Sequence, residues 1–328
     1  PEDAIKPSGD ASGATDGQVI QAALDAAVST KGTVTLGKGL FMVKTQLNVA
    51  GGVTLVGQGW ANTVIKYVGP KDTTGKSRVA AVSGGSVLSH VAITGGKINK
   101  QYEHGGGVHV SGTGGTISWC CVTNNAVFCG NTCGGGIGIA STGSVKIDHT
   151  IVSGNSVEAT SATYGGGGIG TRPGGNLSLE IDACLVSGNT AGTSGSASRG
   201  AGICIVNKKL GDESATDLDK VTTVIRNTTI ANNVSVGSGM GGGFYTSQKK
   251  TTMANCILSD NAAGDGDVNV AFFSDAVKSS VAEKASNCLF GNGTTAFGTA
   301  PVSGSAGFVD AAAGDYRLAK RSPAIGKG

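Results

Sequence analysis

The sequence is poor in charged and aromatic residues and has no long apolar run. Charged residues make up 14% of the 328 residues, aromatic residues make up 5%, and the formal net charge is +3. Without a run of basic residues interleaved with aromatics, nothing in the chain indicates nucleic-acid binding. No apolar stretch approaches the roughly 18 residues that a membrane-spanning helix needs. We therefore expect no nucleic-acid partner and no membrane span.

Glycine is what the sequence has in excess. It accounts for 57 of the 328 residues, about 17%, against about 7% in average proteins. The glycines follow no Gly-X-Y period, which excludes a collagen helix. The hydrophobic share of 39% is too high for a disordered glycine-rich linker. With these two classes excluded, the composition indicates an ordered chain with many tight turns and close backbone contacts.

Six segments of the chain align with one another at intervals of roughly 30 residues, as expected of a repeat protein. They are ISWCCVTNN (117–125), IDHTIVSGN (147–155), IDACLVSGN (181–189), IRNTTIANN (225–233), MANCILSDN (253–261) and ASNCLFGNG (285–293). Their fourth column holds Cys120, Thr150, Cys184, Thr228, Cys256 and Cys288. The sixth column is apolar, and the ninth is asparagine until Gly293 replaces it. The repeat unit therefore presents the same side chains at the same positions.

Two further short strands lie between these segments. One follows a glycine-rich turn and alternates, as in GGGVHV (105–110), GGGIGI (134–139), GGGIGT (166–171), GAGICI (200–205) and GGGFYT (241–246). The other precedes the next segment, as in VKI (145–147) and LSLEI (177–181). Three short strands per unit predict an all-β, single-stranded, right-handed parallel β-helix in which like residues stack into ladders. Asparagine suits the turn ladder because it tolerates the left-handed region.

The N-terminal segment is expected to close one end of the coil. Thr15 and Gln18 have the spacing of a capping box, and the sequence predicts a helix over 15–28. Its apolar stripe comprises Val19, Ile20, Ala23, Leu24 and Ala27. A solenoid needs a cap because its open end would expose the core. We therefore expect an N-terminal cap with the first strands over 1–50, rungs over 51–307 and a C-terminal capping segment over 308–328.

The motifs at both ends resemble those of a known superfamily. The helix ATDGQVIQAALDAA (14–27), followed by GTVTLGKGLFMV (32–43) and GVTLVGQG (52–59), is similar to the entry of pectate-lyase-like β-helix proteins. The rungs also resemble polymorphic outer-membrane-protein-like passengers, and the tail FVDAAAGDYRLAKRSPAIGKG (308–328) resembles the closing segment of secreted bacterial β-helix proteins. The resemblance implies this fold and an extracellular or cell-surface location. It leaves activity open, since the fold hosts lyases, hydrolases, adhesins and phage spikes.

The segment VKIDHT (145–150) is similar to the vWIDH strand motif of pectate lyases. Asp148 and Asp182 occupy the same column of the repeat, so repeat architecture also explains this match. The second lyase signature is only echoed by TRPGGN (171–176), which lacks the second arginine, and the polygalacturonase set is absent.

The eight cysteines do not have the paired spacing of a zinc site. The cysteines in the fourth column of the repeat are expected to face inward. We interpret them first as buried thiols, which behave as small hydrophobic side chains. Cys256 and Cys288 are neighbours in that column and could in principle bond. Cys129 and Cys133 lie in one turn and are the first choice for a local disulfide, with Cys121 as the other candidate.

A candidate catalytic set lies along the outward positions and ends of the strands that follow the glycine turns. It comprises Tyr164, Arg172, Arg199, Lys208 and Tyr245, with His109, Lys249 and Lys250 as substrate-binding candidates. A β-elimination on an acidic polysaccharide needs a cation or Ca²⁺ at the uronate, a base and an acid, and these residue types could supply them. The alternative reading is an ordinary solvated face.

Two acidic clusters could hold Ca²⁺, which prefers several oxygen ligands. One comprises Asp212, Asp217 and Asp219 with Glu213, and the other comprises Asp260, Asp265 and Asp267. Neither has EF-hand spacing, so solvated loop charge is the alternative. No other cofactor is expected.

The sequence therefore favours a secreted or cell-surface β-helix domain that binds carbohydrate or another surface, as adhesins do. A polysaccharide lyase, or less so a glycoside hydrolase, acting on an acidic glycan is the alternative, and a structural spacer is the third. An enzyme should gather a Lys/Arg/Tyr set or a carboxylate pair in a groove, whereas a binding domain should present polar residues along a face.

Overall fold

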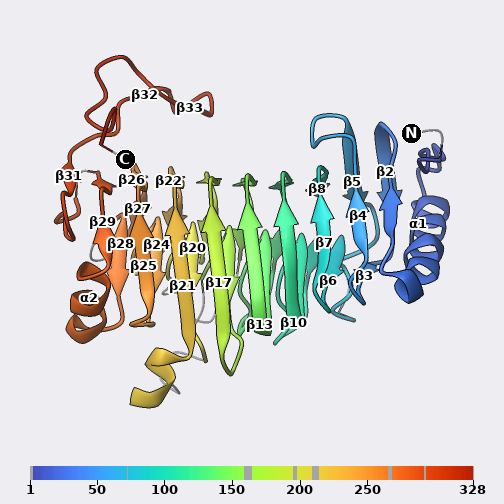
Figure 1. The fold of residues 1–328 in the computed structure, drawn as a ribbon, viewed down its shortest axis with the longest axis horizontal. Helices are drawn as coiled ribbons and strands as arrows, with labels where there is room; N and C mark the ends of the chain where they lie inside the picture. Colours follow the sequence, from blue (N-terminus) through green and yellow to red (C-terminus); the bar gives the residue numbers. More distant parts are fainter. Residues whose placement is uncertain are drawn as a thin grey trace.

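The structure is a computed structural model that describes residues 3–71, 73–158, 165–194, 198–208, 214–264, 268–291 and 293–327. Over these ranges the chain coils into a right-handed parallel β-helix with a helix at its N-terminal end (Figure 1). The fold predicted from the repeat, and implied by the resemblance to pectate-lyase-like proteins, is confirmed. None of the described helices is long and apolar enough to cross a membrane.

The coil has four walls, called A to D here. Wall A contains the strands that follow the glycine turns: β3 (Leu47–Val49), β6 (Ala80–Val82), β10 (Val108–Ser118), β13 (Ile137–Asp148), β16 (Ile169–Thr171), β20 (Ile203–Ile205), β24 (Phe244–Thr246) and β28 (Val270–Phe272). Wall B contains the second halves of β10 and β13 together with β1 (Thr33–Thr35), β4 (Thr54–Val56), β7 (Ser86–Ser89), β17 (Leu177–Asp182), β21 (Val221–Arg226), β25 (Thr251–Ala254) and β29 (Ala285–Ser286).

Walls C and D complete each turn. Wall C contains β2 (Gly39–Val43), β5 (Thr63–Tyr67), β8 (Ala92–Thr94), β11 (Cys121–Thr123), β14 (Ile151–Ser153), β18 (Leu185–Ser187), β22 (Thr229–Ala231), β26 (Ile257–Ser259), β30 (Leu289–Phe290) and β31 (Val302–Ser303). Wall D contains β9 (Lys97–Ile98), β12 (Ala126–Val127), β15 (Ser156–Val157), β19 (Thr190–Ala191), β23 (Val234–Ser235) and β27 (Ala262–Ala263).

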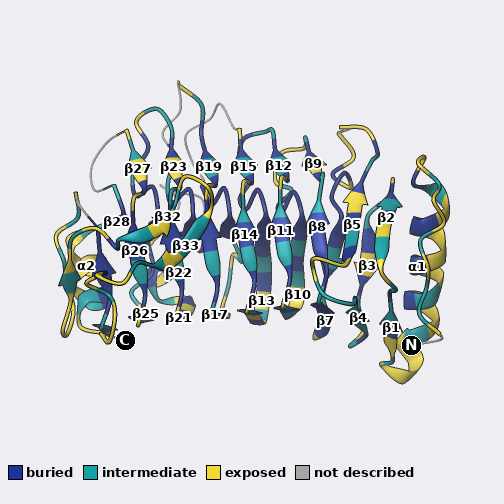
Figure 2. Cartoon of the chain, turned by 90° about the horizontal axis from the view of Figure 1, so that it is seen from above, coloured by how far each residue is buried: buried dark blue, intermediate teal, exposed yellow. Residues whose placement is uncertain are grey.

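The register of the walls reproduces the alignment of the repeat. In wall C the partners run Val122, Val152, Val186, Ile230, Leu258 and Phe290, and every one of these side chains is fully buried. Because side chains alternate along a strand, each inward position becomes a continuous apolar stack along the axis. Figure 2 shows that buried residues recur along the strands of the coil from one end to the other.

Sharp corners separate wall B from wall C. At each corner from β7 onward, one residue has left-handed backbone: His90, Trp119, His149, Ala183, Asn227, Asn255 and Asn287, with φ between 48° and 56°. Asparagine adopts this conformation readily, whereas other side chains incur a cost of about 1–2 kcal/mol. The corner thus bends the chain within a single residue and projects that side chain outward.

An asparagine ladder lines the corner between walls C and D. Its members are Asn125, Asn155, Asn189, Asn233 and Asn261, and each amide Nδ2 donates to Oδ1 of the next asparagine at 2.9–3.0 Å. The ladder continues to Asn269, at 3.0 Å from Asn261, whereas the sequence alignment placed Gly293 in this column. The loop before β28 therefore supplies the last asparagine, which a fixed repeat length could not indicate.

The helix α1 (Ala14–Ala27), extended by a 3₁₀ turn (Val28–Thr30), covers the N-terminal end of the core. Ile20 and Leu24 are buried, as the apolar stripe predicted, but Val19 is 47% exposed. The predicted capping box is wrong: Gly13 is the N-cap, and Thr15 instead donates its N–H and hydroxyl to the carboxylate of Asp10.

The C-terminal end is closed differently. The ring of Phe297 packs on Phe290 at a centroid distance of 4.3 Å and so covers the last rung, beside the helix α2 (Asp275–Ala282). The hairpin of β32 (Phe308–Asp310) and β33 (Asp315–Leu318) folds back over wall C (Figure 2), where the side chain of Asn232 donates to the carbonyl of Ala311.

Candidate functional site

The predicted column on wall A exists but is covered by loops. His109, Gly138, Gly170, Cys204 and Tyr245 are register partners in successive strands. Residues from the preceding turns lie over this column: a Cβ at Gly138 would come within 2.7 Å of the Cβ of His104. The guanidinium of Arg199 lies over the ring of Tyr245, 5.6 Å from its centroid, and Tyr245 is only 2% exposed.

A buried polar cluster occupies the N-terminal part of this column. Arg78 is 3% exposed, and its Nη2 contacts Oε2 of Glu103 at 2.6 Å while its Nη1 contacts Nδ1 of His109 at 3.0 Å. Burial, with help from Arg172 and Arg78, lowers the pKa of His104 to about 3. Burial and the charge of Arg78 also hold the pKa of His109 well below its usual value. Both imidazoles are therefore neutral at physiological pH.

The remaining predicted catalytic residues are dispersed. The guanidinium of Arg172 donates to the carbonyl of Asn131 and lies over the ring of Tyr102. The ammonium of Lys208 pairs with the carboxylate of Asp217 at 3.0 Å. Of the described members of the set, the structure brings together the half-buried Arg199 and the buried Tyr245. Tyr164 lies outside the described residues.

The substrate-binding candidates divide in the same way. His109 belongs to the buried cluster on wall A. Lys249 is half-buried beside Leu218, to whose carbonyl its backbone N–H donates. Lys250 is exposed and lines a hollow on wall B.

The expected disulfide between Cys129 and Cys133 is not formed, and all eight cysteines are free thiols. Cys133 is turned under its loop, with Sγ 3.4 Å from Nδ1 of His104, and burial raises the pKa of its thiol. Cys129 is half-exposed in the same turn. The two side chains thus have different environments although they are close in sequence.

The acidic clusters predicted for Ca²⁺ lie only partly within the described residues, since Asp212, Asp265 and Asp267 fall outside them. Asp217 accepts hydrogen bonds from Ser214 and Lys208, which hold its pKa far below the usual range. Asp260 is exposed at a left-handed corner. Across the described part of the chain, no group of three or more His, Cys, Asp or Glu side chains is placed to hold a metal.

A polar trough runs along the outer surface of wall B. One hollow of about 370 Å³ extends from Gly85 to Glu180, and another of about 480 Å³ extends from Thr142 to Lys250. Both are lined by Ser144 and Ser178, so the two hollows adjoin and together form a depression across the strands from β10 to β21. We call this depression the trough.

Outward side chains of wall B form the floor of the trough. Ser144, Ser178 and Thr222 are register partners in β13, β17 and β21, and all three are exposed. Two positions along the same strands, Lys146 pairs in register with Glu180. Hydroxyl and charged groups therefore recur at the spacing of parallel strands, about 4.8 Å.

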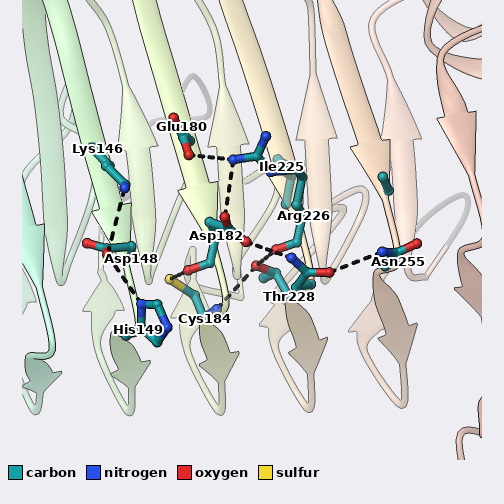
Figure 3. A network of polar contacts seen from close by, with 12 residues as sticks. Lys146, Asp148, His149, Glu180, Asp182, Cys184, Ile225, Arg226, Thr228 and Asn255 are labelled. Carbon is teal, nitrogen blue, oxygen red and sulfur yellow. Dashed lines mark hydrogen bonds and ion pairs between the residues drawn. The ribbon is translucent and has the colours of Figure 1, made fainter. Parts of the chain in front are cut away.

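A network of ion pairs borders the trough toward the corner (Figure 3). Nη2 of Arg226 contacts Glu180 at 2.6 Å and Asp182 at 3.1 Å. Partial burial raises the pKa of Asp182, but hydrogen bonds from Asn227 and Arg226 outweigh it, and the pKa lies below its usual value. One strand away, Asp148 contacts Lys146 at 3.9 Å and Nδ1 of His149 at 3.2 Å.

The trough and the bordering network together contain as many cationic groups as carboxylates. Their cations are Lys146, Lys220, Arg226 and Lys250, and their carboxylates are Asp148, Glu180, Asp182 and Asp219. Equal numbers of each sign leave no net field to attract a strongly charged polymer. The surface instead offers many hydrogen-bond donors and acceptors in a row.

A ladder of stacked rings marks the neighbouring corner. Trp119 stacks on His149 with ring centroids 4.2 Å apart and planes inclined by 12°, and on His90 at 6.1 Å and 16°. Trp119 is 47% exposed. The ring faces contact one another, so the ladder presents its edges to solvent beside the charged network.

Sequence reasoning identified the wall B strands but not their outer surface as a site. The signal was present in the alternation of VKID and LSLEID, whose outward positions hold only polar residues. The cationic and aromatic residues of the sequence point instead to wall A, and the loops that cover this wall have no periodic pattern from which they could be predicted.

Comparison with known proteins gives only weak structural similarities, of which two are described here. No family model matches the chain, and no curated protein matches it. Among solved structures, the A-module of the mannuronan C-5 epimerase AlgE4 of Azotobacter vinelandii is 14% identical, covering 79% of this chain and 94% of that one, with a TM-score of 0.25. The Agl-KA catalytic domain is 12% identical, covering 93% and 66%, with a TM-score of 0.29. Similarities this weak carry no information about the function of this chain.

Proposed function

We propose that the protein is an extracellular or cell-surface domain that binds a linear polysaccharide of low charge density along the trough of wall B. The observation that supports this most is the continuity of the trough, in which hydroxyl and charged groups repeat from rung to rung. A linear glycan presents hydroxyl groups at regular intervals and can satisfy such a row through many weak hydrogen bonds.

Binding rather than cleavage is the better match to the geometry. The described basic and aromatic residues expected for a lyase do not converge in a groove. Arg172 and Lys208 bind other protein groups, and Arg199 lies over the buried ring of Tyr245. Glu180 in the trough and Asp182 in the bordering network both pair with Arg226, and the pKa of Asp182 is held below its usual value by hydrogen bonds from Asn227 and Arg226. A general acid would need a raised pKa instead.

Affinity measurements with a panel of neutral and acidic linear glycans test this proposal. Ser178 is exposed in the middle of the trough, so a Ser178→Trp substitution should block the floor and weaken binding about tenfold or more. Ser153→Trp, on the outer surface of wall C, is the matched control and should bind as the wild type does. In a Trp60→Phe background, fluorescence of Trp119 reports occupancy beside the trough.

Equal binding by the Ser178→Trp and wild-type proteins would move the site elsewhere on the surface. Absence of binding across the whole panel would favour a structural spacer. A growing absorbance from unsaturated sugar ends during the assay would identify a lyase and contradict the binding-only role.

A further inference from the structure

A second hollow, separate from the trough, lies where the loops after β2 and β5 meet at the N-terminal end of wall A. Its volume is about 410 Å³, within the range of small-molecule sites. We propose that this hollow, called the lysine pocket here, binds a sugar that bears a carboxylate, such as a hexuronate. This goes beyond the proposed function, because the pocket is on another wall and its charge differs from that of the trough.

The charge of the pocket favours an anion. Lys44, from the turn after β2, and Lys76, from the loop before β6, both line it. Among the described residues that form its walls there is no carboxylate, and no ion pair in the described part of the chain involves either lysine. Two ammonium groups with no counterion attract an anionic ligand and can donate charge-assisted hydrogen bonds to it.

The other polar groups of the pocket favour a sugar over a simple anion. Nε2 of Gln46 donates to Oδ1 of Asn48 at 2.6 Å, which orients the amide. Its Oε1 is buried and accepts no hydrogen bond from the protein. A buried acceptor without a donor is unfavourable by about 1–3 kcal/mol, and a rotation of the Gln46 side chain toward the pocket would let a ligand hydroxyl group satisfy it. The ligand therefore needs both an anionic group and a hydroxyl donor.

The pocket is held in place by neighbouring elements. The backbone N–H of Asn48 donates to Oε1 of Gln21 on α1 at 2.8 Å, and that of Lys44 donates to the carbonyl of Gly13. Tyr67, which is 3% exposed, also lines the pocket. A site fixed by the cap in this way loses little entropy when a ligand binds.

The test is a titration of the full chain with galacturonate and glucuronate at low ionic strength, followed by calorimetry or NMR. Galactose and glucose are the matched neutral sugars, and inorganic sulfate is the matched simple anion. We expect the uronates to bind, and Lys44→Ala and Lys76→Ala each to weaken binding about tenfold or more. Gln46→Glu should abolish it by placing a carboxylate among the ligand contacts. Lys38→Ala removes an exposed lysine outside the pocket and should change nothing.

Three results would overturn the proposal. If neutral sugars bind as well as the uronates, the lysines do not select the ligand. If sulfate binds as tightly as the uronates, the pocket recognises charge alone. If Lys38→Ala weakens binding as much as Lys44→Ala, the attraction is a general property of the surface. The Ser178→Trp variant, which blocks the trough, should bind uronates normally, so this test and that of the proposed function fail independently.

Discussion

His104 and His109 lie in environments that disfavour the protonated form of their imidazole rings. Burial removes the water that would solvate an imidazolium, and the guanidinium groups of Arg78 and Arg172 add repulsion. Nδ1 of His104 instead accepts from the backbone N–H of Cys133 at 3.1 Å, and Nδ1 of His109 accepts from Arg78. The folded protein therefore uses both rings as neutral hydrogen-bond acceptors.

This arrangement predicts a loss of stability at mildly acidic pH. The folded pKa of each histidine is below its unfolded value of about 6.5, so the unfolded chain takes up protons first. Their contribution to stability is complete above pH 6.5 and is lost as pH falls from there toward about 3 for His104. Between pH 7.5 and 5.5 the free energy of unfolding should fall by about 1 kcal/mol for each histidine.

Denaturant unfolding at both pH values measures this difference. The double variant His104→Gln/His109→Gln keeps a side-chain acceptor at each position and removes the titration, so its pH dependence over this range should be nearly flat. A variant that loses as much stability as the wild type would show that other groups are responsible.

At the scale of elements, the asparagine ladder joins one rung to the next. Oδ1 of Asn189 accepts from both the backbone N–H and the side-chain amide of Asn155 at 3.0 Å. Its Nδ2 donates to the carbonyl of Val152 and to Asn233. All of these groups are buried, so each depends on its neighbour to remain satisfied.

Asn189→Ala should therefore destabilise the protein strongly. The substitution leaves several buried donors and acceptors without partners, at about 1–3 kcal/mol each, and we expect a total loss of about 3 kcal/mol or more. Asn176→Ala, at an exposed position, should change stability by less than about 0.5 kcal/mol. Thermal and denaturant unfolding check both, and a small effect at Asn189 would mean that the coil does not depend on the ladder.

At the scale of the whole molecule, a coil of parallel strands has two open ends where core side chains and strand edges would meet water. The helix α1 closes one end with Ile20 and Leu24, both nearly inaccessible, against the core. Phe290 and Phe297 close the other end. Caps of this kind also prevent the end strands from pairing with another copy of the chain.

Leu24→Asp should loosen the N-terminal cap. A carboxylate in the place of a 1% exposed leucine removes apolar contacts and buries a charge, so we expect a loss of about 3 kcal/mol or more and association through the exposed end. Val19→Asp, on the exposed face of the same helix, is the control. Unfolding curves and light scattering measure the two effects, and a monodisperse, stable Leu24→Asp protein would show that the coil does not need this cap.

The periodic part of the molecule could be predicted from the sequence because each rung places the same kinds of side chain in the same environments. The inward columns, the asparagine corner and the capping helix follow from residue type and spacing, and the strands bear them out from Val122 to Phe290. The loops have no period. The burial of Tyr245 depends on loops of different length that pack over the coil. The position of Asn269 at the end of the ladder depends on such a loop as well.

The sequence by itself determined the β-helix, three of its four walls and its N-terminal cap, since these arise from interactions between neighbouring rungs that repeat along the chain. Only the tertiary structure decided which outer surface is open. The glycines on wall A admit His104 and Cys133 from adjacent turns and close that face, whereas the outward residues of wall B remain uncovered and form the trough. The physical reason is that surface access depends on the paths of nonrepeating loops, which side-chain periodicity does not specify.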